Sequence, residues 1–253
     1  MPGDPFDPAL DCTRHRPWAM PDAPWVARQS WVDVLFAHWP VDPAAGRPLV
    51  PGDFDLDCYD AAAWIGIVAF KMRNVAPRGV PALPWLSAFP ELNLRTYVRA
   101  GGRAGVYFFS LDAGRTLAVL AARRAFNLPY FRASMHVAAG RVITYRSRRR
   151  GADAAFTAIY GPAGGEASEP ACGTIEHFLT ERYCLFNLDH RNRPYRLDIH
   201  HRPWQLQRAH ADISRNTVAA AHRLSLPSTP PTLHFAARQD MVMWLPRRIA
   251  AGS

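Results

Sequence analysis

Polar and apolar side chains alternate along the segment Phe89–Val98, as they do in a β-strand. One face of this strand would carry a carboxylate, an amide, a guanidinium and a phenol, from Glu91, Asn93, Arg95 and Tyr97. Such a row could bind an anion and exchange protons with it if it lined a cavity inside a closed sheet. It could equally be the solvent-facing edge of a sheet whose other face is apolar. The strand alone leaves both alternatives open.

Two further residues could belong to the same site. Tyr130 follows Pro129 at the start of a predicted strand, where its hydroxyl could donate a proton or hydrogen-bond an oxyanion. The alternative for Tyr130 is an aromatic core residue with a satisfied hydroxyl. Arg95 and Arg123 could each bind a carboxylate through two hydrogen bonds, or one of them could pair with Glu91 in a structural network.

Length and composition narrow the class of protein. A chain of 253 residues can form one large β domain or two small domains. No run of eighteen apolar residues predicts a membrane span, and the first residues lack the basic and apolar regions of a signal peptide. The four cysteines, Cys12, Cys58, Cys172 and Cys184, are scattered, which favours reduced thiols. We therefore expect a cytoplasmic protein.

The net charge of +9 comes almost entirely from arginine, because Lys71 is the single lysine among 30 basic residues. The one dense basic run, Tyr145–Arg150, could bind phosphates but is more typical of a solvated surface. No motif that reads nucleic acid is present, so we do not expect a nucleic-acid partner. The histidines lack metal-ligand spacing and no glycine-rich phosphate loop occurs, so we expect neither a metal nor a cofactor.

Short strands with frequent turns predict a barrel or sandwich. We expect residues 1–23 to form an irregular arm and residues 24–253 a single domain. Helical spacing predicts helices at 24–39, 115–127, 174–180 and 214–222. The first of these rests on the apolar stripe of Trp25, Trp31, Val32, Leu35 and Trp39. Strands are predicted at 53–59, 63–72, 89–98, 105–112, 130–138, 140–148, 154–160, 182–187, 194–201, 232–235 and 241–245. The pair Gly101-Gly102 predicts a hairpin.

Several phrases of the chain resemble the YqjF-like family of uncharacterised bacterial proteins. They are Trp64-Ile-Gly-Ile-Val-Ala-Phe, Phe89-Pro-Glu-Leu-Asn-Leu-Arg-Thr-Tyr-Val, Gly105-Val-Tyr-Phe-Phe-Ser-Leu-Asp-Ala, Phe126-Asn-Leu-Pro-Tyr, Phe178-Leu-Thr-Glu-Arg-Tyr and His201-Arg-Pro-Trp. The resemblance runs from about residue 24 to residue 247. That family is similar to the acetoacetate decarboxylase-like superfamily, which implies an α+β, β-rich fold around a closed, cone-shaped barrel with a few flanking helices. The implied pocket lies inside the barrel, which favours a cavity for the polar row.

The resemblance also implies a change of chemistry. The decarboxylase phrase of Leu-Asp, a short helix, an arginine and Pro-Lys-Lys corresponds here to Leu111-Asp112, Arg123, Pro129, Tyr130 and Phe131. The first lysine of that phrase is the Schiff-base nucleophile, and a phenol cannot form an imine with a ketone. The decarboxylase glutamate corresponds to Glu91, so the resemblance keeps the carboxylate and loses the covalent step.

Two hypotheses follow. The first is lysine-independent acid–base chemistry on a small oxo-acid or related carbonyl compound. In it Glu91 shuttles a proton, Tyr130 polarises the carbonyl, and Arg95 or Arg123 binds the carboxylate beside Asn93. The alternative is a non-catalytic protein that binds or senses a small molecule in the same pocket. Either way we expect an anionic small-molecule ligand, and a homo-oligomer is possible.

Overall fold

The computed structural model describes residues 6, 10–83, 87–115 and 126–249. Its strands are β1 (Ala27–Val41), β2 (Asp55–Leu56), β3 (Ala63–Pro77), β4 (Phe89–Ala100), β5 (Arg103–Ala113), β6 (Tyr130–Ala139), β7 (Ile143–Arg149), β8 (Ala155–Pro162), β9 (Cys184–Leu188), β10 (Pro194–His201), β11 (Gln207–Asn216), β12 (Thr232–Met243) and β13 (Arg247–Arg248). The helices are α2 (Pro43–Gly46) and α4 (Ile175–Thr180), with 3-10 turns η1 (Arg47–Leu49) and η2 (Ala220–His222). None of the described helices is long and apolar enough to cross a membrane.

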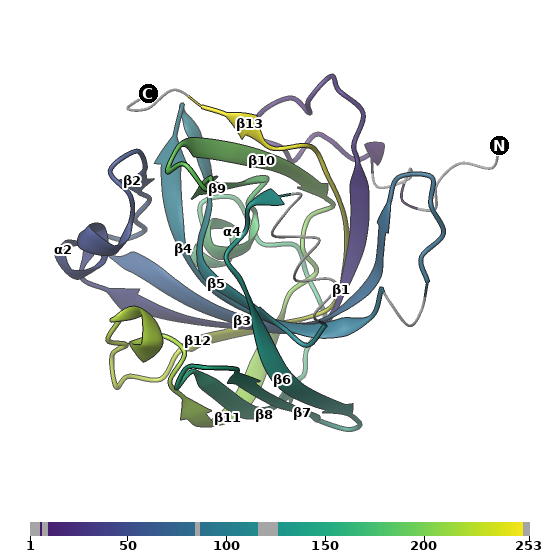
Figure 1. The fold of residues 1–253 in the computed structure, drawn as a ribbon. Helices are drawn as coiled ribbons and strands as arrows, with labels where there is room; N and C mark the ends of the chain where they lie inside the picture. The colour runs from purple at the N-terminus through teal and green to yellow at the C-terminus, as the bar shows by residue number, and fades with distance from the viewer. Residues whose placement is uncertain (1–5, 7–9, 84–86, 116–125, 250–253) are drawn as a thin grey trace.

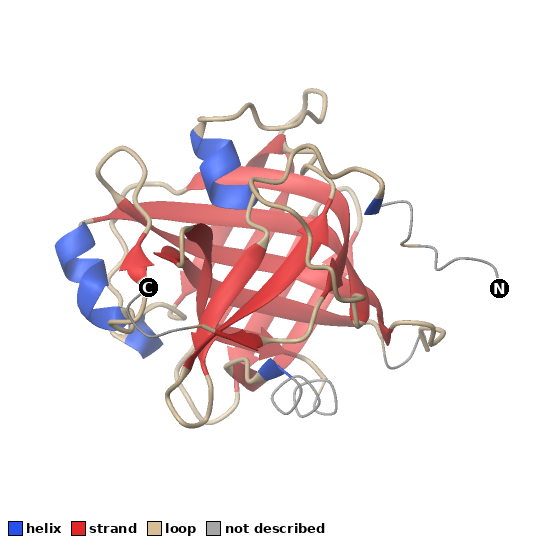
Figure 2. Ribbon diagram, turned by 90° about the horizontal axis from the view of Figure 1, so that it is seen from above, coloured by secondary structure: helices blue, strands red, loops and turns tan. Residues whose placement is uncertain are grey.

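Strand pairing closes a barrel (Figure 1). Neighbours around the ring are β1, β3, β4, β5, β9, β10 and β12, and β12 pairs with β1 again. The pairs are antiparallel except β5–β9, which is parallel. Closure removes the free sheet edges. The predicted β-rich α+β class with a closed barrel is confirmed, and Figure 2 shows that strands dominate and helices are short.

A second layer covers one side of the barrel. Strands β6, β7, β8 and β11 form a sheet that lies below β3 and β12 in Figure 1. Its inward side chains, including Tyr145, Phe156 and Tyr160, form one core cluster with outward residues of β1, β3 and β4 such as Leu92 and Leu94. These barrel strands are therefore buried on both faces, which explains their nearly continuous apolar sequence.

The helix predicted at 174–180 is confirmed as α4, which lies within the ring of strands in Figure 1. Thr174 begins it as predicted, because its hydroxyl accepts a hydrogen bond from the His177 backbone amide. Leu179 is fully buried in the core cluster that faces the barrel interior. The predicted hairpin at Gly101-Gly102 is also confirmed, since both glycines have positive φ between β4 and β5.

The predicted helix at 24–39 is wrong, because this segment is strand β1. A bulge explains the helical spacing. Asp33 has a φ of 55°, and the register against β3 shifts between Val32 and Leu35. Trp31 and Val34 therefore both belong to the cluster that faces the interior, three residues apart as in a helix. Burial of β1 on both faces adds further apolar residues to the pattern.

The predicted helix at 214–222 is wrong for most of its length. Strand β11 continues to Asn216, and only Ala220–His222 forms a 3-10 turn. Along β11 exposed and half-buried residues alternate, so one face packs and the other meets solvent. The separate strands predicted at 232–235 and 241–245 are one strand, β12, and the strand predicted at 53–59 is reduced to β2. Most of the helix predicted at 115–127 lies outside the described residues. The division into an arm and one domain stays a prediction.

The basic run at 145–150 is only partly a solvated surface. Its odd-numbered members up to Arg149 are buried, and its even-numbered members, such as Arg148, are exposed. The Arg149 guanidinium donates to Asp112 at 2.7 Å and to Ser110 at 2.6 Å, and lies 3.0 Å from the ring nitrogen of His222. Asp112 is fully buried, so this buried ion pair joins the second sheet to the outer face of β5.

Replacing Arg149 by Met should destabilise the protein by about 3–5 kcal/mol, because Asp112 would remain buried without its cation. Arg148→Met, one position away on the solvent face, should change the free energy of unfolding by less than about 0.5 kcal/mol. Urea denaturation of both variants measures the difference. Equal stabilities would show that the buried pair contributes nothing to the joint between the sheets.

Candidate functional site

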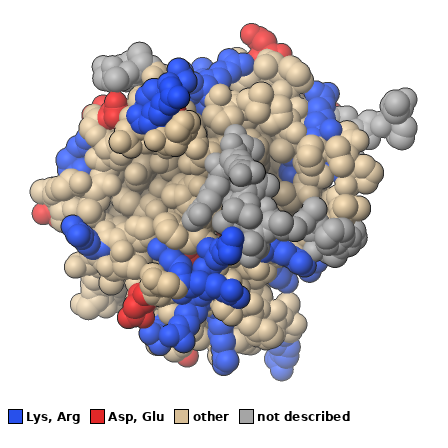
Figure 3. All heavy atoms as spheres, viewed as in Figure 1, with Lys and Arg blue, Asp and Glu red and all other residues tan. Residues whose placement is uncertain are grey.

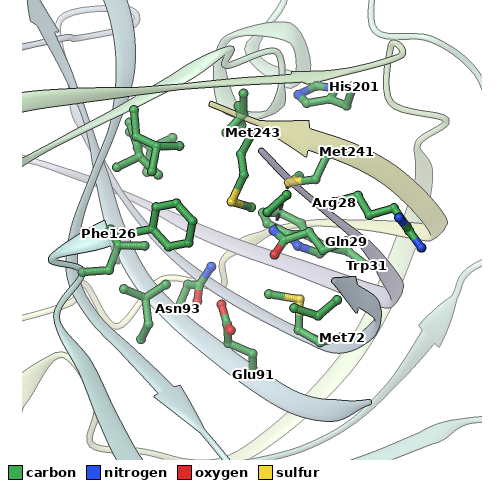
Figure 4. A pocket seen from close by; sticks show the side chains of 18 of the residues that line it. Arg28, Gln29, Trp31, Met72, Glu91, Asn93, Phe126, His201, Met241 and Met243 are labelled. Atoms are coloured by element: carbon green, nitrogen blue, oxygen red, sulfur yellow. Dashed lines mark hydrogen bonds between the residues drawn. The ribbon is translucent and has the colours of Figure 1, made fainter. Parts of the chain in front are cut away.

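The polar row of β4 faces the inside of the barrel. A cavity of about 610 Å³ lies there, and Glu91, Asn93 and Arg95 line it. Figure 4 shows Glu91 and Asn93 side by side with their polar ends directed into the cavity. Tyr97 is fully buried in the interior cluster, whereas Leu92 and Leu94 pack outward against the second sheet. Of the two alternatives that the sequence left open, the structure favours the cavity over the solvent-facing edge.

The remaining wall of the cavity is mostly apolar. Its apolar and sulfur-containing members include Trp31, Met72, Phe89, Phe108, Leu111, Phe126, Leu128, Leu185, Leu197, Ile199, Trp204, Met241, Met243 and Leu245. The face seen in Figure 3 is hollowed beneath β10, and the hollow is lined mainly by uncharged residues. The site is therefore a small group of polar side chains in an apolar chamber, which is the usual composition of a ligand pocket.

Glu91 and Tyr130 form a hydrogen-bonded pair at the wall of this cavity. The Tyr130 hydroxyl donates to Glu91 Oε2 at 2.9 Å. Burial raises the pKa of Glu91 to about 8, against the opposing effect of the hydrogen bond from Tyr130. Burial and the neighbouring Glu91 also raise the pKa of Tyr130 well above its ordinary value. At pH 7 the carboxyl is thus mainly protonated and the phenol keeps its proton.

The side chain of Asn93 has unused hydrogen-bonding capacity. It is 0% exposed, and neither its amide nitrogen nor its amide oxygen has a partner among the residues that the structure describes. A buried amide without partners is costly, and native proteins rarely leave one unsatisfied. Because Asn93 lies between Glu91 and Arg95 on the cavity face, a bound molecule could supply both missing partners.

Arg95 is buried in the same wall without a carboxylate beside it in the described part of the chain. Its guanidinium donates to the Leu179 carbonyl at 3.1 Å and to the Tyr97 hydroxyl at 3.2 Å. His38 Nε2 lies 2.7 Å from the same hydroxyl, and burial lowers the pKa of His38 well below its ordinary value, with the nearby Arg95 charge adding to the effect. Glu91 bonds to Tyr130, so the predicted alternative of an Arg95–Glu91 pair is not the arrangement observed. The positive charge of Arg95 remains available to an anion.

A close backbone approach holds this arginine and histidine in place. A Cβ added at Gly66 would lie 2.6 Å from His38 Nε2 and 3.4 Å from the Arg95 side chain. Any residue with a Cβ at position 66 would displace the His38 side chain and crowd that of Arg95, so this position requires glycine.

Arg182 is a cavity residue that the sequence did not reveal. It differs from Arg95 because Asp57 lies 2.5 Å from it and balances its charge. Gln29, Trp31 and His201 also line the cavity and were not predicted. Gln29 and Trp31 belong to β1, for which the sequence pattern predicts a helix, so the pattern does not place them on a cavity wall.

The other candidate residues lie elsewhere. Arg123 lies outside the described residues. Lys71 forms an ion pair with Asp33 and is not part of the cavity wall. Phe131 points away from the cavity, with its ring 4.2 Å from the Arg149 guanidinium, as alternation after Tyr130 requires. The chain's single lysine lies close to Glu91 along the β3–β4 pairing, opposite Pro90, but its side chain is on the other face of the sheet and pairs with Asp33.

Solved structures share this barrel. One is the enduracididine biosynthesis enzyme MppR complexed with the condensation product of pyruvate and imidazole 4-carboxaldehyde, with 12% identity, 91% of this chain and 92% of that chain covered, and a TM-score of 0.64. Another is the acetoacetate decarboxylase of Legionella pneumophila, with 13% identity, 96% and 95% covered, and a TM-score of 0.61. At these identities the likeness concerns the fold. The fold is that of the acetoacetate decarboxylase-like proteins.

The sequence places the chain more narrowly. The model of the family DUF2071, described as an uncharacterized conserved protein, matches residues 28–240. The uncharacterized protein YqjF of Bacillus subtilis (strain 168) is 48% identical over 228 residues, which cover 89% of this chain and 93% of YqjF. The protein belongs to the DUF2071 family, and the predicted resemblance to YqjF is confirmed.

The pH dependence of stability tests the burial of Glu91. Its pKa is about 8 in the folded protein against an ordinary 4.5, so this carboxyl stabilises the fold fully below pH 4.5. The contribution, up to about 4 kcal/mol, is lost as the pH rises towards 8. Between pH 5 and 8, the free energy of unfolding should therefore fall more steeply for the wild type than for Glu91→Gln. Parallel profiles in urea denaturation would contradict the raised pKa.

The position of Lys71 predicts that the protein forms no imine in its cavity. Borohydride reduction in the presence of pyruvate or acetoacetate should leave no adduct on Lys71, because its ammonium group is paired with Asp33 away from the cavity. Peptide mass spectrometry after digestion reads the result. A reduced adduct on Lys71 would mean that this lysine reaches the ligand.

Proposed function

We propose that the protein binds a carbonyl-bearing carboxylate in its barrel and catalyses proton transfer to or from that compound without a covalent intermediate. Enolisation, dehydration and aldol chemistry without an imine belong to this class. The observation that carries the proposal is the buried Glu91 carboxyl, which is hydrogen-bonded to Tyr130 on the cavity wall and lies beside Asn93, whose side-chain amide has no partner among the described residues. Burial raises the pKa of this carboxyl to about 8, which favours its protonated form.

Each polar residue has a distinct role in this proposal. Glu91 donates a proton to the carbonyl oxygen, or takes one from the adjacent carbon once it is ionised. Tyr130 donates a hydrogen bond to Glu91. It is not a source of protons for the reaction, because its pKa is raised well above the ordinary value. Asn93 hydrogen-bonds the oxygen on which negative charge develops. Arg95 attracts the carboxylate.

The pH governs which form of the pair is active. With a pKa of about 8, Glu91 is protonated in about a tenfold excess at pH 7. A step that needs the acid form should slow as the pH rises through 8, and a step that needs the base should accelerate. A raised carboxyl pKa in an apolar site is a recurrent feature of acid catalysts.

Binding without catalysis is the second candidate. The apolar extent of the cavity supports it, because such walls give affinity whether or not a reaction follows. In that case Asn93 and Arg95 would anchor the ligand and Glu91 would only hydrogen-bond it. The partners are small molecules in both cases.

Hydrogen exchange separates the two candidates. A panel of 2-oxo and 3-oxo acids is incubated with the protein in D₂O, and proton NMR follows the hydrogens next to the carbonyl. The wild type should accelerate their loss, and Glu91→Gln should reduce the acceleration by about 10²–10⁴-fold because it cannot transfer the proton. Tyr160→Phe is the matched control, since that hydroxyl bonds to the Asp33 carbonyl on the outer face of the barrel. A ligand that binds and exchanges no faster than in buffer would favour pure binding.

A further inference from the structure

The cavity is far larger than a small oxo-acid needs. A volume of 610 Å³ could hold on the order of twenty water molecules. An oxo-acid with three or four carbons would displace only about five of these water molecules. Pockets of this volume bind molecules of drug size. A small acid at the polar row would leave most of the chamber to water or to empty space, and both are unfavourable against apolar walls.

The polar row of β4 faces a wall that carries the methionines together with polar side chains that already have partners, such as Gln29. Glu91, Asn93 and Arg95 all come from β4. Across from Glu91 and Asn93 in Figure 4 lie Met241 and Met243 of β12. A ligand that satisfies both regions needs one polar end and one apolar body.

The other polar residues of the wall already have partners. The side-chain amide of Gln29 donates to the Met241 sulfur at 3.1 Å, and the Thr180 hydroxyl donates to the Glu176 carbonyl at 2.8 Å. Arg182 is paired with Asp57. The unmet capacity of the Asn93 amide therefore marks the end of the cavity where the polar group of a ligand belongs.

Three methionines, Met72, Met241 and Met243, line the apolar part of the cavity. Their unbranched, polarisable side chains adapt to flexible apolar ligands better than branched ones do. The wall also includes Leu245, which is 60% exposed, so the cavity reaches the surface beside this residue. A hydrocarbon chain could extend from the polar row past the methionines towards this opening.

We propose that the ligand is amphipathic: a carbonyl-bearing carboxylate with a hydrocarbon chain of roughly six to ten carbons, whose polar end contacts Asn93 and Arg95 and whose chain lies along the three methionines. This rests on the proposed function for the polar end and adds the substrate class. It distinguishes the cavity from one built for a small oxo-acid alone.

A series of straight-chain carboxylates from butanoate to decanoate tests the chain length directly. Trp31 and Trp204 line the cavity, so their fluorescence reports binding. Affinity should rise about fourfold for each added methylene until the chain reaches the opening. Affinities that agree within twofold from butanoate to decanoate would overturn the proposal.

A cavity-filling variant locates the chain. Met243→Trp should weaken decanoate binding at least tenfold and butanoate binding less than twofold, because it occupies the apolar region and leaves β4 unchanged. Ile159→Trp is the matched control on the exposed face of β8, and it should leave both affinities unchanged. Equal losses for both acids in Met243→Trp would place the chain elsewhere and overturn the proposal.

The outcome is independent of catalysis. Binding of unreactive carboxylates needs no proton transfer. If the protein failed to accelerate hydrogen exchange on the oxo-acids, the dependence of affinity on chain length would still hold. Conversely, exchange catalysed on short oxo-acids together with a flat chain-length series would keep the proposed function and reject the amphipathic ligand.

Discussion

Burial of β4 on both faces is the constraint from which the site follows. The second sheet covers the outer face, where Leu92 and Leu94 pack against its aromatic residues. Alternation then leaves the polar residues of β4 no direction except the barrel interior. Tyr145 of the second sheet fixes the strand further, since its hydroxyl donates to the Glu91 backbone carbonyl at 2.6 Å. The layer outside the barrel thus positions the carboxyl inside it.

The same burial sets the electrostatics of the site. A carboxyl moved from water into an apolar wall favours its neutral form, which is why the pKa of Glu91 rises. The guanidinium of Arg95, further along the same wall, donates hydrogen bonds to the Leu179 carbonyl and the Tyr97 hydroxyl. One wall therefore presents, in order along β4, a carboxyl with a raised pKa, an amide without a partner in the described part of the chain, and a guanidinium. That order is the basis for proposing a ligand that carries both a carbonyl and a carboxylate.

Local patterns in the sequence were sufficient for some elements and not for others. The alternation in β4 and the Thr174 cap involve neighbours along the chain, so both could be read directly. The bulge at Asp33 breaks the period of β1, and the resulting spacing imitates a helix. The opposite wall of the cavity depends on the register of β12, which is about 150 residues away from β4 in sequence. Met241 and Met243 therefore could not be assigned to the site from local spacing.

The exchange of a lysine for a phenol at residue 130, which the family resemblance implies, alters what the carboxyl can do. A lysine next to Glu91 would keep the carboxyl ionised through its charge. Tyr130 offers only a neutral hydrogen bond, which is too weak to offset burial, and the pKa of Glu91 stays high. The substitution thus removes a nucleophile and at the same time produces a neutral acid at physiological pH. In the proposed function, proton transfer by Glu91 and the lack of imine chemistry would both follow from this one change in the cavity wall.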